Sequence, residues 1–198
     1  KQFVKVPIMS SQQVVRVELG ERSYNVVVGP GVRSQIASMV PASAKRAIIV
    51  TQATIPFSVE ESLVAAGIST RTINIGPGEE FKSLATIEMI MRECAQFGLT
   101  RNDVIIGVGG GMVTDIAGFA ASAWHRGIAV VHVSTTLVGM VDAAIGGKTG
   151  VNLAEGKNLV GAFWQPRGVL CDTDALASLS PRETRCGNGE MAKYHFLT

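Results

Sequence analysis

The chain has few charged residues, few cysteines and no long apolar run, and each shortage excludes a class of protein. Charged residues are 17% of its 198 residues and the formal net charge is +2, so no basic stripe is available for nucleic acid or anionic lipid. Its apolar runs extend for about four to seven residues, far below the ~20 needed to cross a bilayer, and no signal-peptide pattern occurs. We therefore expect no nucleic-acid partner and no membrane partner.

The three cysteines do not form a disulfide or metal-binding pattern. Cys94, Cys171 and Cys186 are an odd set without CxxC spacing, and each lies among apolar or small residues. Such cysteines are typical of buried thiols in a reducing compartment. We expect three buried thiols and a cytoplasmic protein.

The apolar residues, 46% of the chain, are sufficient for one sizeable core and are arranged as alternating strands and helices. Apolar stretches at 14–19 and 24–28 flank a polar turn at 20–23, which predicts a hairpin after a loose leader at 1–11. Further strands are predicted at 47–51, 70–75, 103–108 and 128–133, and helices at 31–40, 56–66, 83–98 and 112–124.

Residues 103–108 are apolar on both faces, as expected for a strand covered on both sides. The pattern therefore predicts an α/β fold: an open, mostly parallel, Rossmann-like sheet with helices on both faces and an amino-terminal hairpin.

Many of the 22 glycines lie between Gly98 and Gly161, and three of them end a predicted strand. Gly109-Gly110-Gly111 leads from strand 103–108 into helix 112–124, which brings unpaired N–H groups and a positive helix end to a phosphate or pyrophosphate. The spacing is neither GxGxxG nor a Walker loop, so a tight turn without a ligand is the alternative. Asp115, expected in the first helical turn, either complements the helix dipole or holds a ribose hydroxyl.

A second polar cluster follows strand 128–133. Thr135 and Thr136 either cap the next helix or reach a ligand at the carboxyl edge of the sheet. Residues 141–158 then place charged and amide side chains among glycines, which suits a phosphorylated or carboxylated substrate. These side chains are Asp142, Lys148, Lys157 and Asn158. The alternative is a solvated loop with charges at random.

These motifs closely resemble the 3-dehydroquinate synthase family. The similarity rests on Gly-Gly-Gly-Met-Val-Thr-Asp at 109–115, Thr-Thr-Leu at 135–137, Gly-Gly-Lys-Thr-Gly-Val-Asn at 146–152 and Gly-Lys-Asn at 156–158. It implies an NAD-binding α/β domain at 12–180, followed at 181–198 by the start of a helical metal-binding domain that is truncated here. The family cyclises 3-deoxy-D-arabino-heptulosonate 7-phosphate to 3-dehydroquinate with phosphate elimination, in the shikimate pathway, using NAD and zinc or cobalt.

The resemblance also implies roles for individual residues. Without it, Glu79 and Lys82 indicate only a helix start with a capping acid. Arg126 matches an arginine that reaches the phosphate in a neighbouring subunit, which implies a homodimer. The implied cofactor-binding residues are Glu79, Lys82, Gly110, Gly111, Asp115, Thr135, Thr136, Asp142, Lys148 and Lys157. The implied catalytic residues are Asp142, Lys148, Asn158, Lys193 and Arg126.

Glu190 matches the family's metal-binding glutamate, and the other two ligands are histidines further along the family's chain. His125, His132 and His195 match neither position, and residues 195–198 depart from the family pattern. We therefore expect a part that carries the NAD-binding residues and is inactive alone. Alternatives are a cyclase forming valiolone or aminodehydroquinate, a polyol dehydrogenase, or a non-catalytic NAD-binding or dimerisation module.

Overall fold

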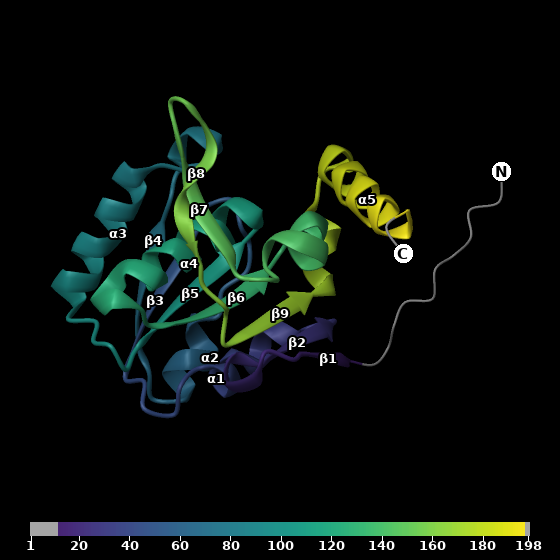
Figure 1. Ribbon diagram of the computed structural model, residues 1–198. Helices are drawn as coiled ribbons and strands as arrows, with labels where there is room; N and C mark the ends of the chain where they lie inside the picture. The colour runs from purple at the N-terminus through teal and green to yellow at the C-terminus, as the bar shows by residue number, and fades with distance from the viewer. Residues whose placement is uncertain (1–11, 197–198) are drawn as a thin grey trace.

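The computed structural model describes residues 12–196, which form a seven-stranded sheet covered by helices and a separate two-stranded hairpin (Figure 1). The strand order is β1-β2-β9-β6-β5-β3-β4, with β1 antiparallel to β2 and every other pair parallel. The strands are β1 (Gln13–Val17), β2 (Tyr24–Gly29), β3 (Arg46–Thr51), β4 (Ser69–Asn74), β5 (Val104–Gly109), β6 (Ala129–Ser134) and β9 (Gly168–Asp172). The predicted open, mostly parallel sheet with an amino-terminal hairpin is confirmed. The leader expected at 1–11 lies outside the described residues.

Helices cover both faces of the sheet because successive side chains of a strand point to opposite sides. On β5, Ile105 packs with α3 (Leu84–Phe97) and α4 (Gly111–Ala123). Its neighbour Ile106 packs on the other face, with α1 (Ile36–Met39) and α2 (Glu60–Ala65). All six residues of β5 are buried, which explains why its sequence is apolar throughout. In Figure 1, α3 and α4 lie on one side of the strands, and α1 and α2 on the other.

Local signals set the ends of α3, which was predicted at 83–98. The Ser83 side chain accepts a hydrogen bond from the Thr86 amide at the first turn, as an N-cap does. Gly98 ends the helix in the left-handed conformation, with φ of 68°, which glycine adopts without steric cost. The 3-10 turn η3 (Glu79–Phe81) precedes this helix, so Glu79 is not the capping acid.

Several elements after residue 134 were not predicted. Residues 141–158, for which we predicted a ligand-binding stretch or a solvated loop, include the end of a π-helical turn, η5 (Gly139–Ala143), and most of a β-hairpin. The hairpin strands are β7 (Lys148–Leu153) and β8 (Gly156–Phe163). Gly150 pairs with Gly161, and a Cβ on Gly161 would lie 2.0 Å from the Thr149 carbonyl oxygen. These two glycines therefore permit close strand contact and need not face a ligand.

The chain then passes through β9 and the 3-10 helix η6 (Thr173–Ser178) into α5 (Pro181–His195). A capping box starts α5: Ser180 Oγ accepts from the Glu183 amide, and the Glu183 carboxylate accepts from the Ser180 amide. In Figure 1, α5 stands beside the carboxyl ends of the central strands.

The cysteine prediction is correct for two residues and wrong for the third. Cys94 and Cys171 are buried, and burial raises the pKa of each thiol to about 12. Cys186 is exposed because it lies on α5, which packs only one face against the domain. Within residues 12–196, no helix combines the length and apolar character that a bilayer span requires.

Candidate functional site

A cleft of about 580 Å³ lies at the carboxyl ends of β3, β5 and β6, and we call it the main cleft. Five of the predicted cofactor-binding residues line it: Glu79, Gly110, Gly111, Thr135 and Thr136. The carboxyl edge is where open parallel sheets bind ligands, since successive strands end there in loops and helix N-termini. The main cleft thus gathers predicted residues from η3, the β5–α4 turn and the segment after β6.

The glycine turn forms one wall of the main cleft at the start of α4. A Cβ on Gly110 would lie 2.9 Å from Thr136 Cγ2, and a Cβ on Gly111 would lie 2.9 Å from Ala143 Cβ. Side chains at either position would therefore fill the space beside the first N–H groups of the helix. Those N–H groups have no intrahelical acceptor, so this wall suits an anion.

The hydroxyls after β6 have a capping role as well as a place in the cleft. Thr136 Oγ1 accepts a hydrogen bond from the Gly139 amide at 3.1 Å, which caps the turn that continues into η5. Thr135 is buried and lines the same wall. For Thr136, capping and lining the cleft therefore occur together.

A second pocket of about 430 Å³ adjoins the main cleft, and Asp115, Asp142, Lys148 and Asn158 line it. Ala143, which contacts the Gly111 position, belongs to its wall, so the two cavities share a boundary. Lys148 Nζ donates to Asp142 Oδ1 at 2.8 Å, and this hydrogen bond raises the pKa of the lysine. The second pocket therefore presents a protonated ammonium beside carboxylates.

Asp115 is not in the first turn of its helix, so the helix-dipole interpretation is wrong. Helix α4 begins at Gly111, one residue earlier than predicted, and Asp115 lies beyond its first turn. Burial raises the pKa of its carboxyl, although the ammonium of Lys82 opposes this shift. The buried Lys82 Nζ lies 2.5 Å from both Asp115 Oδ2 and Asn158 Oδ1. Lys82 thus lines neither cavity and instead holds two residues of the second pocket.

Glu79 and Lys157 contact each other where the β7–β8 hairpin meets η3. Glu79 Oε1 accepts from Asn152 Nδ2 at 2.8 Å and lies 3.5 Å from Lys157 Nζ. The Asn152 hydrogen bond is the main cause that lowers the pKa of Glu79. The hairpin is also fixed by the backbone N–H of Asn152, which donates to the backbone carbonyl of Lys82 at 2.8 Å. Glu79 therefore remains ionised at the mouth of the main cleft, and Lys157 lies on the exposed side.

Three further predicted residues, Glu190, Lys193 and Arg126, line neither cavity. Glu190 and Lys193 form an ion pair on α5, and that hydrogen bond raises the pKa of Lys193. Arg126 ends the 3-10 turn η4 (Trp124–Arg126), just before the amino end of β6 and thus at the opposite edge of the sheet. The described residues contain no group of three His, Cys, Asp or Glu side chains that could hold a metal. Since catalytic zinc needs three protein ligands, these residues do not complete a metal site around Glu190.

Sequence reasoning missed the opposite wall of the main cleft. Phe57, from the loop between β3 and α2, lines it together with Leu179, Arg182 and Cys186. The capping box at 180–183, with proline at the first helical position, could have predicted α5 and hence Arg182. Phe57 was expected in the helix predicted at 56–66, but α2 begins only at Glu60 and leaves Phe57 in the preceding loop.

A mostly parallel sheet with a glycine turn facing a cleft at its carboxyl edge defines the class of open α/β domains that bind ligands at that edge. Within that class, the chain belongs to the 3-dehydroquinate synthase family, whose N-terminal domain model matches residues 72–186.

Two sequence relatives and one solved structure illustrate the similarity. The chain is 48% identical over 184 residues to an Amycolatopsis mediterranei (strain S699) protein with the provisional name aminodehydroquinate synthase, covering 92% of this chain and 51% of that protein. It is 43% identical over 199 residues to the 3-dehydroquinate synthase of Nitrobacter winogradskyi (strain Nb-255), covering 97% of this chain and 52% of that protein. The structure of 2-deoxy-scyllo-inosose synthase with carbaglucose-6-phosphate, NAD⁺ and Co²⁺ superposes on this chain with a TM-score of 0.84 at 30% identity. The match covers 91% of this chain and 50% of that one. The chain therefore spans about half the length of the relatives it matches.

Proposed function

We propose that this chain is the NAD-binding part of a 3-dehydroquinate synthase of the cytoplasmic shikimate pathway, a phosphate-eliminating carbon–oxygen lyase. The whole protein would convert 3-deoxy-D-arabino-heptulosonate 7-phosphate to 3-dehydroquinate, for aromatic amino acid biosynthesis. The observation that carries the proposal is the pair of adjoining cavities, one walled by a glycine turn and the other by Lys148 and Asp142. A dinucleotide in the main cleft would end beside a phosphorylated substrate in the second pocket. The three free cysteines agree with a reducing compartment.

The main cleft fits NAD because Gly110 and Gly111 leave space at the helix N-terminus where a pyrophosphate is stabilised. The ionised Glu79 carboxylate would accept hydrogen bonds from a ribose hydroxyl. Bound NAD supplies a reversible hydride acceptor, so that a transient oxidation and its reversal leave no net redox change.

In the second pocket, Lys148 would bind a phosphate or hydroxyl oxygen of the substrate. Asp142 orients the ammonium at 2.8 Å, and the raised pKa keeps the lysine protonated. Asp115 and Asn158, both held by Lys82, would contact the nicotinamide end of the cofactor and the substrate. We also propose that Lys193 binds the substrate, and that a zinc or cobalt ion takes Glu190 as one ligand. The described residues contain no group of three possible ligands, so the other ligands of this ion would lie outside them.

We further propose a homodimer in which Arg126 of one subunit serves the phosphate bound by the other. The support is that Arg126 is exposed at the far edge of the sheet and has no ion pair among residues 12–196. Light scattering of the chain in solution tests the dimer. A monomer over the whole concentration range would contradict it.

Incubating the chain with NAD, zinc and the heptulosonate phosphate tests the activity assigned to this part. We expect NAD binding by calorimetry without phosphate release, because the described residues assemble no complete metal site. Phosphate release at rates typical of an enzyme, above about 1 s⁻¹, would contradict the inactive-part proposal.

An aminodehydroquinate synthase is the second candidate, favoured by the 48% identity to the Amycolatopsis protein. An assay of the whole protein with 3-deoxy-D-arabino-heptulosonate 7-phosphate and with its amino analogue separates the two candidates. Turnover of the amino analogue alone would favour the aminodehydroquinate synthase. Stable dimers without NAD affinity would instead favour a non-catalytic dimerisation module.

A further inference from the structure

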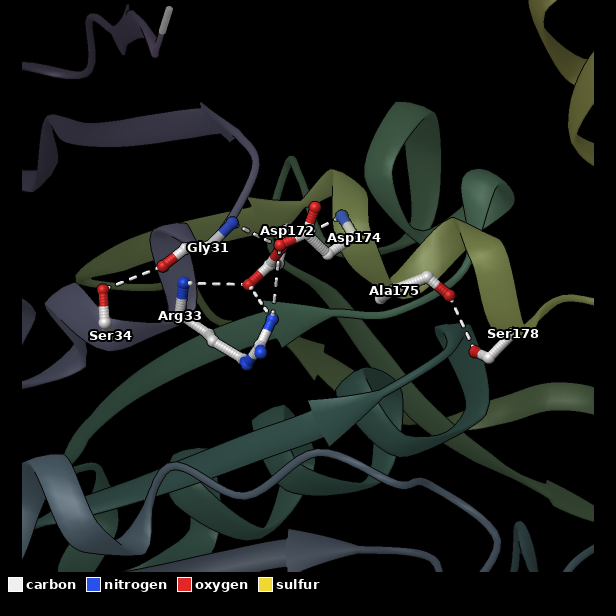
Figure 2. Close-up of polar contacts among 7 residues, drawn as sticks. All are labelled: Gly31, Arg33, Ser34, Asp172, Asp174, Ala175 and Ser178. Atoms are coloured by element: carbon white, nitrogen blue, oxygen red, sulfur yellow. Dashed lines mark hydrogen bonds and ion pairs between the residues drawn. The ribbon is translucent and has the colours of Figure 1, made fainter. Parts of the chain in front are cut away.

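The carboxylate of Asp172, at the carboxyl end of β9, joins two segments that are far apart in the chain (Figure 2). Its side chain is only 1% exposed and accepts hydrogen bonds from the Gly31 amide at 3.0 Å and the Arg33 amide at 3.2 Å. Arg33 Nη1 donates to the same carboxylate at 2.7 Å. On its other side, the Asp174 amide donates at 3.1 Å and begins η6. One buried anion therefore fixes both the turn between β2 and the 3-10 helix η2 (Val32–Gln35) and the start of η6.

The first arm of this cluster ends on a wall of the main cleft. The Arg33 guanidinium carbon lies 4.9 Å from the centroid of the Phe57 ring, a cation–π contact. Phe57 lines the main cleft. Asp172 is the nearer of the two carboxylates that pair with this guanidinium, since Asp174 Oδ2 lies 4.0 Å from Nη1. Asp172 therefore holds the cation on which the ring stacks more closely than Asp174 does.

The second arm reaches the same cleft through η6. Asp172 caps this 3-10 helix, and Ser178 Oγ closes its last turn by donating to the Ala175 carbonyl at 2.7 Å. Ser178 and Leu179 line the main cleft immediately before α5 begins. Both parts of the wall that sequence reasoning missed, the Phe57 loop and the η6–α5 junction, are therefore linked to one carboxylate.

We propose that Asp172 is a positioning residue for the cofactor cleft, acting through Arg33 on Phe57 and through η6 on Leu179. This inference rests on the proposed function, because it assigns the main cleft to NAD. Asp172 itself does not line the cleft, so its effect on NAD is indirect.

Asp103 offers a matched control because it is an equally buried carboxylate at the opposite edge of the sheet. It is 2% exposed, precedes β5, and accepts from the Lys45 and Arg46 amides at 2.9 Å and from the Thr100 amide and hydroxyl at 2.8 and 2.7 Å. None of these residues lines the main cleft. Asp172→Asn and Asp103→Asn therefore both remove a buried charge that accepts four hydrogen bonds, and among the described residues only that of Asp172 pairs with a cation.

The experiment measures NAD affinity by calorimetry and amide hydrogen exchange without NAD, on the 198-residue chain and both variants. We expect Asp172→Asn to weaken NAD binding about three- to tenfold and to speed exchange in segments 52–59 and 173–179. Asp103→Asn should leave NAD affinity and those segments unchanged. Equal NAD affinity in Asp172→Asn and the parent chain, or equal weakening by both variants, would overturn the inference.

Two further measurements keep the proposal testable. If Asp172→Asn does not fold, Arg33→Met tests the first arm, since it removes the cation while leaving the three backbone donors of Asp172. Its effect on the NAD dissociation constant should be non-additive with that of Phe57→Leu, and additive effects would overturn the inference. If the parent chain does not bind NAD, the proposed function fails. The exchange measurement then decides the inference about Asp172 separately.

Discussion

Lys82 and Asp115 form a nearly buried ion pair across 33 residues of sequence, with Nζ 2.5 Å from Oδ2. Their side chains are 6% and 18% exposed. The same ammonium also holds Asn158 on the β7–β8 hairpin. The pair therefore joins the segment before α3, helix α4 and the hairpin at the base of the second pocket.

Replacing Lys82 by methionine should destabilise the chain by about 3 kcal/mol at neutral pH, because Asp115 is left as a buried, unpaired anion. The loss should shrink as the pH falls and Asp115 takes up a proton, since burial raises the pKa of this carboxyl. Urea unfolding at several pH values measures both effects. Arg92→Met is the control: Arg92 pairs with Glu88 on the surface, and its loss should cost under about 1 kcal/mol. Equal losses for the two variants would contradict this account.

Alanine at Gly110 or Gly111 should weaken NAD binding at least about tenfold with a smaller effect on stability. Either Cβ would lie 2.9 Å from a neighbouring side-chain carbon and fill the wall beside the α4 N-terminus. Gly189→Ala on α5 is the control, because a Cβ there meets nothing within 4 Å. Calorimetric titration of the three variants measures this effect. NAD affinity that survives both glycine-turn substitutions would place the cofactor elsewhere.

His132 should make the chain sensitive to acid. It is fully buried on β6, its Nδ1 has no hydrogen-bond partner among the described residues, and burial lowers its pKa to about 4. The unfolded chain, with a pKa near 6.5, then binds the proton more readily than the folded chain. The stability contribution is therefore present above about pH 6.5 and falls by about 3 kcal/mol as the pH approaches 4.

His132→Gln should remove this part of the pH dependence, whereas the exposed His125 provides a control substitution. Unfolding free energies between pH 4 and 7 provide the comparison. A His132→Gln variant with the pH profile of the parent chain would show that other groups cause the acid sensitivity.

One thiol should react rapidly with a disulfide reagent, and NAD should slow that reaction. Cys186 is exposed and lines the main cleft, whereas Cys94 and Cys171 are buried with pKa values raised to about 12. Thiol titration followed by peptide mapping identifies the modified residue. Labelling of Cys186 at the same rate with saturating NAD would argue against a dinucleotide near α5.

Sequence alone predicted most strands and helices before residue 134 because their apolar periodicity is strong, as in the fully buried β5. The helices predicted at 31–40 and 56–66 are shorter in the structure, where α1 covers Ile36–Met39 and α2 covers Glu60–Ala65. The β7–β8 hairpin escaped because its glycines interrupt that periodicity. β9 is an unbroken buried run of five residues, which periodicity does not distinguish from a buried helix segment.

The candidate site was predicted in the same uneven way. Glycines between a strand and a helix mark a turn at the carboxyl edge from local sequence, so the position of Gly110 and Gly111 on the main cleft could be predicted. The contact between Lys82 and Asp115 could not, because it depends on how η3 and α4 pack. The exposure of Cys186 likewise depends on which face of α5 packs against the domain, shown by Gly187, whose Cβ position lies 2.5 Å from Leu137.

The most direct test of the whole account is a crystal structure of this chain grown with NAD. We predict the pyrophosphate at Gly110 and Gly111, between the Thr135–Thr136 wall and Phe57, with the nicotinamide toward Asp115 and Lys148. A dinucleotide bound at another surface, or a main cleft without it at saturating concentration, would contradict the central claim.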